Sequence, residues 1–433
     1  MVFYVYNHYI MSFIILFSIF FFMTPSANAE NSNPQHQYYV STTGNDENTG
    51  TIDNPWLTIQ KAANSTKPGD TVFVREGIYS EFVTILNSGT EDDGYITFKA
   101  YPGEKPVLDA KKKEVKVGNI AFFTLKKASY IIIDGFEMKN LLTNGSEYYP
   151  NGILVTEESD NIKLLNNNIH HIENHSIKGN AHGILIYGNS STSIHDITIQ
   201  NNQIHHLTLG YSEALTLSGN VEKFIVSNNK VFNNNNIGID VAGFYKACPS
   251  NCIDQVRDGK ISNNMVYKNS SKNNPVYNGH LAAGGIYADG STKIVIHNNL
   301  VYKNDFGIEL ASENYGKKTS YITVENNNIF NNNGAGLIIG GASKSNGGAF
   351  KNIIRNNEFS LNDRLNQGYG EITLQYQVNM NQFLNNIFYI NKNTELFHFS
   401  DKKEKSNTIN NNKEYFQILF SPHYDLMIFK DFT

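Results

Sequence analysis

With 433 residues, of which 40% are hydrophobic and 17% charged, the chain has the composition of a folded protein rather than a disordered one. The formal net charge of −5 provides no basic excess, which argues against a protein that binds nucleic acid. The length alone allows two or three domains.

The amino-terminal segment has the pattern of a secretion signal. Ile10 to Met23 form an almost continuous apolar run of 14 residues, which is shorter than the about 20 residues of a membrane-spanning helix. An Ala-Asn-Ala sequence ending at Ala29 then supplies small residues for cleavage. We therefore predict a signal peptide over residues 1–29, a secreted, cell-surface or periplasmic protein, and no stable membrane insertion after cleavage. Since no Lys or Arg precedes the apolar run, an uncleaved anchor is the alternative.

Residues 38–68 have the order of a small capping segment. A strand-forming run begins at Tyr38, a loop rich in Gly and Asn follows, and Thr58 precedes a short helical stretch. A Pro-Gly-Asp turn then leads into an alternating run that ends at Tyr79 and that we interpret as the first coil of a solenoid. Because a stack of coils exposes an apolar end unless something covers it, we predict an N-terminal cap here.

A repeated asparagine phrase, Asn-Asn-x-(Ile/Val/Phe), defines most of the remaining chain, at spacings of 27 to 35 residues. Its eight copies begin at Asn166, Asn201, Asn228, Asn263, Asn298, Asn326, Asn356 and Asn385. Repeats of this length, with short alternating β segments and no helical period, predict a parallel β solenoid over residues 69–390. We expect the asparagines to stack from coil to coil and to satisfy backbone groups of the turns. A β-propeller is the alternative, but its blades need about 40 residues and hairpin turns.

Two further groups of residues have simple structural interpretations. His182, His170/His171 and His205/His206 recur at turn positions, so we expect them to pack in the turns. The repeat fades after Tyr389, and we predict that residues 391–433 form a C-terminal cap or tail. The chain is predicted to be a monomer.

The stretch from Tyr38 to Tyr79, together with the Asn-Asn coils, resembles the right-handed parallel β-helix proteins of the pectin-lyase-like superfamily, including polysaccharide lyase family 9. The resemblance implies an all-β, right-handed parallel β-helix with an N-terminal cap. It does not select a reaction, because this superfamily contains lyases, glycoside hydrolases, epimerases and non-catalytic binders.

A short strand phrase lies between most copies of the repeat, and its alternation predicts which side chains face the core. The phrases begin at Gly152, Gly183, Glu213, Gly238, Gly285, Gly307, Gly336 and Glu371. When they are aligned by their first residue, the second and fourth residues are apolar or small and are predicted to point inward. In the third phrase this alignment places Ala214 and Thr216 inside, and Leu215 and Leu217 outside.

Three carboxylates fall at outward positions of successive coils. Asp240, Asp289 and Glu309, with Tyr287 between them, follow this alternation onto one outer face. Acidic residues disfavour strands, and they repel one another across the about 4.8 Å between neighbouring strands. We therefore predict that the three carboxylates form a functional site on that face.

The strand that ends at Asp289 and the next phrase, Gly-Ile-Glu309-Leu, resemble the catalytic strands of glycoside hydrolase family 120, the β-helical β-xylosidases. This resemblance implies that Asp289 is the nucleophile and Glu309 the acid/base. Asp240 is then a third carboxylate that raises the pKa of a neighbour by like-charge repulsion. Backbone spacing leaves both retaining and inverting hydrolysis open.

Residues near this face are candidates for substrate binding. Asp254 and Arg257 lie in a long insertion after the Asp240 strand, which we expect to form a wall of the cleft. Tyr245, Tyr287 and Glu313 are further candidates, since tyrosine rings give sugars a flat apolar contact.

Cys248 and Cys252, in the same insertion, are predicted to form a local disulfide. Zinc binding is the alternative for this pair, but the sequence supplies no further ligands at a suitable spacing.

The predicted activity is that of a secreted glycoside hydrolase without a cofactor, acting on a polysaccharide or oligosaccharide. A calcium-dependent pectate-type lyase is the first alternative, with Asp240, Asp289 and Glu309 as oxygen ligands of Ca²⁺. The lyase needs a base, and no Lys or Arg occupies an outward position of the aligned strands. A non-catalytic carbohydrate-binding or surface β-helix is the second alternative.

Overall fold

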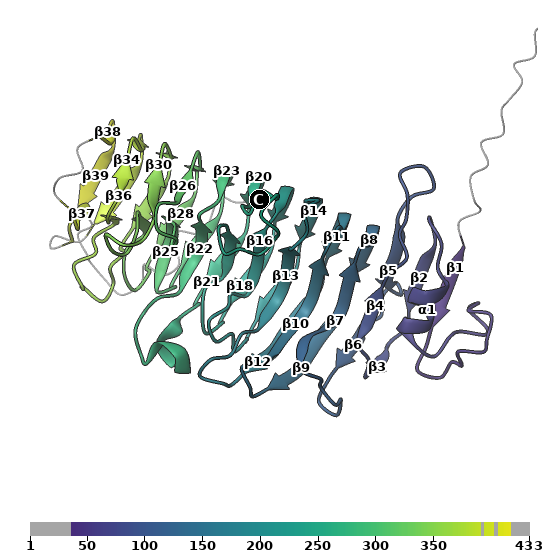
Figure 1. The fold of residues 1–433 in the computed structure, drawn as a ribbon. Helices are drawn as coiled ribbons and strands as arrows, with labels where there is room; N and C mark the ends of the chain where they lie inside the picture. Colours follow the sequence, from purple (N-terminus) through teal and green to yellow (C-terminus); the bar gives the residue numbers. More distant parts are fainter. Residues whose placement is uncertain (1–35, 391–393, 402–405, 417–433) are drawn as a thin grey trace, which may run out of the picture. The chain divides into compact units, whose positions relative to one another are not determined.

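A computed structural model describes residues 36–390, 394–401 and 406–416. The predicted signal peptide and most of the predicted C-terminal tail lie outside the described residues. The described chain winds in successive coils, each of which contributes one strand to each of three parallel sheets in turn (Figure 1). The predicted parallel β-helix is confirmed.

Within the described ranges, the first sheet, called sheet 1, has 16 strands. They are β1 (Gln37–Val40), β2 (Thr71–Val74), β5 (Ile96–Ala100), β8 (Ser129–Asp134), β11 (Asp160–Leu165), β14 (Ile194–Gln200), β17 (Val221–Ser227), β20 (Arg257–Ser262), β23 (Thr292–His297), β27 (Thr323–Glu325), β31 (Ile353–Arg355), β35 (Gln382–Leu384) and β38 (Thr408–Asn410), with β26 (Lys318–Ser320), β30 (Gly348–Phe350) and β34 (Val378–Asn379) as a side branch.

Sheet 2 has 12 strands in the described part of the chain. They are β3 (Gly77–Tyr79), β6 (Pro106–Asp109), β9 (Glu137–Thr143), β12 (Asn168–Asn174), β15 (Gln203–His205), β18 (Lys230–Phe232), β21 (Met265–Tyr267), β24 (Leu300–Tyr302), β28 (Asn328–Phe330), β32 (Glu358–Ser360), β36 (Ile387–Ile390) and β39 (Lys413–Phe416).

Sheet 3, which carries the candidate site, has 11 strands among the described residues. They are β4 (Val83–Ile85), β7 (Gly118–Lys126), β10 (Tyr148–Thr156), β13 (His182–Gly188), β16 (Leu215–Gly219), β19 (Ile239–Ala242), β22 (Gly284–Asp289), β25 (Phe306–Ala311), β29 (Leu337–Ile339), β33 (Ile372–Leu374) and β37 (Phe397–Phe399).

The N-terminal segment has the predicted order of elements. β1 pairs with β2, and helix α1 (Ile59–Ser65) follows a loop. Thr58 caps this helix, because its hydroxyl accepts a hydrogen bond from the Lys61 N–H. Ile59 and Ala62 of α1 are buried in the core. Two short 3₁₀ helices, η1 (Ser271–Asn273) and η2 (Pro275–Tyr277), interrupt the connection between β21 and β22.

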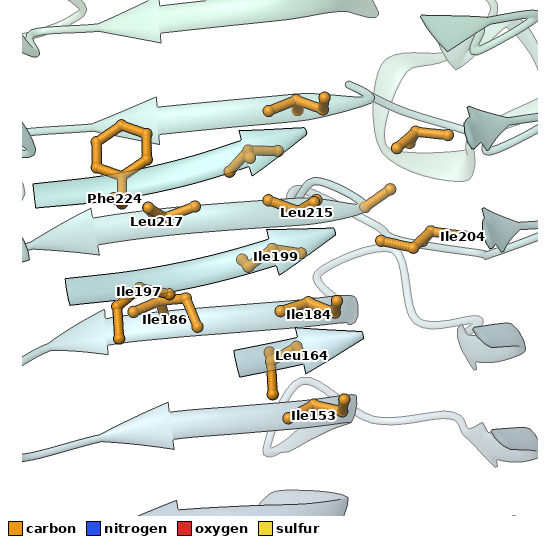
Figure 2. Packing of buried hydrophobic residues seen from close by; sticks show 14 of the residues in the cluster. Ile153, Leu164, Ile184, Ile186, Ile197, Ile199, Ile204, Leu215, Leu217 and Phe224 are labelled. Carbon is orange, nitrogen blue, oxygen red and sulfur yellow. The ribbon is translucent and has the colours of Figure 1, made fainter. Parts of the chain in front are cut away.

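The core consists mainly of aliphatic residues, with phenylalanines such as Phe224 among them, packed between the three sheets (Figure 2). Ile184 and Ile186 of β13 pair in register with Leu215 and Leu217 of β16, and all four are fully buried. The prediction that Leu215 and Leu217 point outward was therefore wrong, and Thr216 is the outward residue. The alignment was off by one residue because this phrase lacks the leading glycine, and a shift of one position exchanges the two faces of a strand.

The predicted asparagine stack is confirmed. The second asparagine of each phrase is buried and donates from both its backbone N–H and its side-chain amide to the Oδ1 of the corresponding asparagine in the next coil. This ladder runs through Asn167, Asn202, Asn229, Asn264, Asn299, Asn327, Asn357, Asn386 and Asn412. The first asparagine of each pair adopts the left-handed conformation, with φ of 56° at Asn263. This residue type tolerates that conformation better than most.

No helix in the described part of the chain is long and apolar enough to cross a membrane.

Candidate active site

A cavity of about 800 Å³ lies over the outer face of sheet 3, across strands β7 to β22. Its lining includes four carboxylates and six tyrosines. They are Glu213, Asp240, Asp289 and Glu313, and Tyr149, Tyr187, Tyr211, Tyr245, Tyr277 and Tyr287. Six neighbouring strands at about 4.8 Å spacing extend about 24 Å, which suits a chain of several sugar units.

Strand register brings the acidic residues together. Thr216, Asp240 and Tyr287 occupy one row of neighbouring strands, and Asp289 lies two residues beyond Tyr287 on the same face. Asp240 and Asp289 are only 4% and 3% exposed. The predicted placement of these two carboxylates and Tyr287 on a shared outer face agrees with the structure.

Asp289 and Glu313 are joined by one tyrosine. The Tyr245 hydroxyl contacts Asp289 Oδ2 and is 3.0 Å from Glu313 Oε2. The Glu313 backbone N–H also donates to Asp289 Oδ1, at 3.1 Å. Because each hydrogen bond spans about 3 Å, the two bridged carboxylate oxygens lie at most about 6 Å apart.

Tyr245 lies on the loop between β19 and β20. Hydrogen bonds of Asp254 and Arg257 with backbone groups hold this loop in place. Asp254 accepts hydrogen bonds from the Lys246 and Ala247 N–H groups. Arg257 forms an ion pair with Glu222 at 2.8 Å and donates to loop carbonyls. The two residues therefore lie outside the lining that the sequence predicted for them, and they hold the loop that carries Tyr245.

Cys248 and Cys252 are joined by a disulfide within the same loop.

Glu213 is a cavity residue that sequence reasoning missed. Its Oε2 accepts a hydrogen bond from the Thr216 hydroxyl at 2.9 Å. His182 Nδ1 is 3.1 Å from the Glu213 carbonyl oxygen and 2.9 Å from Thr216 Oγ1. Burial lowers the pKa of His182 to about 4, so the imidazole is neutral and contributes no positive charge at neutral pH. His182, predicted only to pack in a turn, lines the cavity.

Glu309 is not part of the lining. It faces outward in register with Tyr287, as the alternation predicts, but its Oε1 is buried and has no hydrogen-bond partner. A Cβ placed on Gly284 would lie 2.4 Å from this oxygen, so the glycine leaves the room that the carboxylate occupies. Burial raises the pKa of Glu309 to about 8. Glu309 thus occupies the outward strand position that was predicted, but its side chain does not line the cavity.

The cavity is electrostatically unusual because its carboxylates lack basic partners. Among the described residues that line it, none is Lys or Arg. Burial raises the pKa of Asp240 well above its ordinary value, and Glu213 and Asp289 add repulsion. Burial also raises the pKa of Glu213 to about 7 and of Asp289 to about 8, although hydrogen bonds to each carboxylate oppose these shifts.

Calcium ligation by Asp240, Asp289 and Glu309 belongs to the lyase alternative alone. In the described ranges, no group of three or more His, Cys, Asp or Glu side chains has an arrangement that could hold a metal ion.

Comparisons with known proteins place the chain in a family. Residues 38–205 match the family model "Pel9A-like, right handed beta helix region", and residues 151–359 match "Right handed beta helix region". YwoF of Bacillus subtilis (strain 168), an uncharacterized protein, is 37% identical over 375 residues, which cover 86% of this chain and 79% of YwoF. The chain belongs to this right-handed β-helix family. The predicted resemblance to pectin-lyase-like β-helix proteins is thereby confirmed.

Solved structures of β-helix proteins show the same fold in carbohydrate-active enzymes of different reaction classes. A GH136 lacto-N-biosidase from Eubacterium ramulus has a TM-score of 0.61 at 13% identity, over 88% of this chain and 68% of that one. A rhamnogalacturonan lyase has a TM-score of 0.54 at 14% identity, over 87% of each chain. At these identities the likeness concerns the fold alone, so the reaction must be argued from the site.

Proposed function

We propose that this β-helix protein is a secreted glycoside hydrolase, with Asp289 as the nucleophile and Glu313 as the acid/base. The observation that carries the proposal is the pair of carboxylates bridged by Tyr245 inside a cavity large enough for an oligosaccharide. Retaining glycosidases hold two carboxyl groups about 5 to 5.5 Å apart, and inverting ones hold them about 6.5 to 9.5 Å apart. The limit of about 6 Å between the bridged oxygens favours the retaining mechanism.

The hydrogen bonds of Asp289 support its role as the nucleophile. Each of its two carboxylate oxygens faces a donor, the Glu313 N–H and the Tyr245 hydroxyl. An ionised carboxylate accepts both bonds, whereas a protonated one would have to give up an acceptor position for its own proton. The donors also fix the carboxylate in one orientation for attack.

The proposed reaction has two steps. Asp289 attacks the anomeric carbon while Glu313 donates its proton to the leaving oxygen, so that the glycosidic bond breaks and a glycosyl ester forms. Glu313, now ionised, removes a proton from water, which attacks the anomeric carbon and releases Asp289. Glu313 thus takes the role that the sequence resemblance gave to Glu309, because Glu313 lies in the cavity beside Asp289.

The charge of the cavity favours hydrolysis over elimination from a uronate. A uronate substrate would bring another carboxylate into a site lined by four acidic side chains without Lys or Arg among the described residues. Elimination also needs a positive charge that neutralises the carboxylate of the substrate. Among the described residues that line the cavity, no Lys or Arg supplies one. We therefore propose a substrate without a uronate at the cleaved bond.

Reaction products test this assignment. The purified protein is incubated with a panel of plant, algal and bacterial polysaccharides and neutral aryl glycosides. We expect new reducing ends, or released phenol, with retention of anomeric configuration by NMR. Ultraviolet absorbance from an unsaturated uronate product would instead establish a lyase. Absence of turnover across the panel, with glycan binding retained, would favour a non-catalytic binder.

The activity is expected to have an optimum in pH, because the reaction needs Asp289 ionised while Glu313 still holds a proton. Burial raises the pKa of Asp289 above its ordinary value. The ascending limb of a plot of kcat/KM against pH should therefore have its midpoint well above the pH at which an ordinary aspartate ionises. An activity that is constant from acidic pH to neutrality and then falls in a single step would indicate that Asp289 is the proton donor.

A further inference from the structure

We propose that Glu213 and Asp240 form a subsite for a protonated amine, so that the substrate contains an amino sugar with a free amino group beside the cleaved bond. This inference rests on the proposed hydrolysis and specifies its substrate. It uses two carboxylates that the reaction of Asp289 and Glu313 does not need.

Glu213 and Asp240 lie on neighbouring coils of sheet 3. Thr216 pairs in register with Asp240, so their backbones are separated by about 4.8 Å. The Thr216 hydroxyl donates to Glu213 Oε2 at 2.9 Å, which holds this carboxylate beside the same row. Both acidic side chains line the cavity next to the strand of Asp289.

Asp240 has an unused acceptor inside the cavity. Its side chain is almost completely buried, and Oδ1 has no hydrogen-bond partner. A buried polar atom without a partner costs about 1 to 3 kcal/mol, and a buried charge without a partner costs more. A ligand that donates a hydrogen bond to this oxygen would remove that cost.

An ammonium group is the donor that matches the surroundings best. It has three N–H donors and a positive charge, so it can bond Glu213 and Asp240 together. A neutral hydroxyl could bond Asp240 but would leave the repulsion between the two carboxylates uncompensated. The rings of Tyr277 and Tyr287 also line the cavity, and aromatic rings favour a nearby cation.

The loop that carries Tyr277 is itself fixed over the site. Asp305 accepts hydrogen bonds from the Ser271 and Ala283 N–H groups at 2.8 and 3.2 Å. Asn236 Nδ2 donates to the Tyr277 hydroxyl at 3.1 Å. The subsite therefore has a wall that is held in place by the coils beneath it.

Calorimetric titration of the full-length protein tests the subsite. The probes are a tetramer of β-1,4-linked glucosamine, its fully N-acetylated counterpart and a tetragalacturonate. They are titrated at several pH values on both sides of neutrality, because burial raises the pKa of Glu213 to about 7 and both the carboxylate and the sugar amine must be charged to attract each other. We expect the amine tetramer to bind at least about tenfold more tightly than the N-acetylated tetramer, a difference of about 1.4 kcal/mol, and tetragalacturonate to bind most weakly.

Two variants test the carboxylates themselves. Glu213→Gln and, separately, Asp240→Asn should each reduce the preference for the amine to about twofold or less. Added salt should weaken binding of the amine tetramer more than that of its neutral counterpart.

A matched control variant accompanies the titration. Glu91→Gln changes an exposed carboxylate between β4 and β5 that is not part of the cavity lining, and it should keep the preference. Circular dichroism and a thermal melt establish that each variant is folded before titration.

Equal binding of the two glucosamine probes, or a preference that survives in both folded subsite variants, would overturn the subsite. Because binding needs no turnover, hydrolysis of neutral glycosides without an amine preference would reject the subsite alone. An amine preference without hydrolysis of any glycan would reject only the proposed function.

Discussion

Replacing Asp289 with Asn is expected to lower kcat/KM on any hydrolysed substrate by roughly a thousandfold or more, because the amide cannot attack the anomeric carbon. The substitution preserves the size of the side chain and leaves an oxygen for the Tyr245 hydroxyl, so the fold should be retained. Initial rates of the variant on a substrate from the glycan panel measure the effect. A companion Glu313→Gln variant should lose a comparable factor on substrates with a poor leaving group.

Glu309→Gln is the matched control for this prediction. Glu309 neighbours Tyr287 in register, but it lies outside the cavity lining. We expect this variant to retain activity within about tenfold of the parent protein, since a residue that does not touch the substrate cannot transfer its proton directly. A loss at Glu309→Gln as large as that at Asp289→Asn, together with an active Glu313→Gln, would return the acid/base role to Glu309.

The fold could be predicted because the Asn-Asn phrase recurs at regular spacings of 27 to 35 residues. Each Asn-Asn phrase encodes two different requirements, a left-handed turn residue followed by a buried amide, as Asn263 and Asn264 illustrate. These requirements repeat in every coil, so one correct reading of the phrase describes most of the solenoid. The alternation of the strand phrases then predicted the outward direction of Asp240 and Asp289.

The site could be predicted only in part, for two physical reasons. An outward position says that a side chain leaves the core, but it does not say what lies above it. Glu309 is outward yet outside the cavity lining, with its Oε1 buried and without a partner, whereas Glu313 lies beyond the end of β25 and lines the cavity. Asp254 lies in the loop where the sequence placed it, and Arg257 begins the strand that follows, β20. The contacts of both residues depend on how that loop folds back, which no repeat encodes.

Glu213 was missed through a register error that the sequence could have prevented. Its phrase was aligned by the first residue, although the apolar pair Leu215 and Leu217 has the spacing of the core pairs Ile184 and Ile186. Alignment by the apolar pair places Thr216 outward and moves Glu213 to the position of His182. Core pairs are the more reliable guide in such repeats, because burial fixes strand register whereas the turn before a strand varies in length.

Replacing Asn264 with Ala is expected to destabilise the protein by about 3 to 5 kcal/mol, because one side chain serves three coils. Its Oδ1 accepts from both the backbone and the side-chain amide of Asn229, and its Nδ2 donates to the Val226 carbonyl and to Asn299 Oδ1. Alanine leaves these groups buried without partners and adds a small cavity. The midpoint of chemical denaturation, followed by circular dichroism, and amide hydrogen exchange at the neighbouring coils measure the loss.

Asn263→Gly is the matched control, since this neighbouring residue is exposed and adopts a φ of 56° that glycine also tolerates. Its stability should change by less than about 1 kcal/mol. The contrast between the two variants separates the buried amide from the turn conformation. If Asn264→Ala were as mild as Asn263→Gly, the ladder would contribute little to stability, and the coils would be held together mainly by the apolar rows and the strand hydrogen bonds.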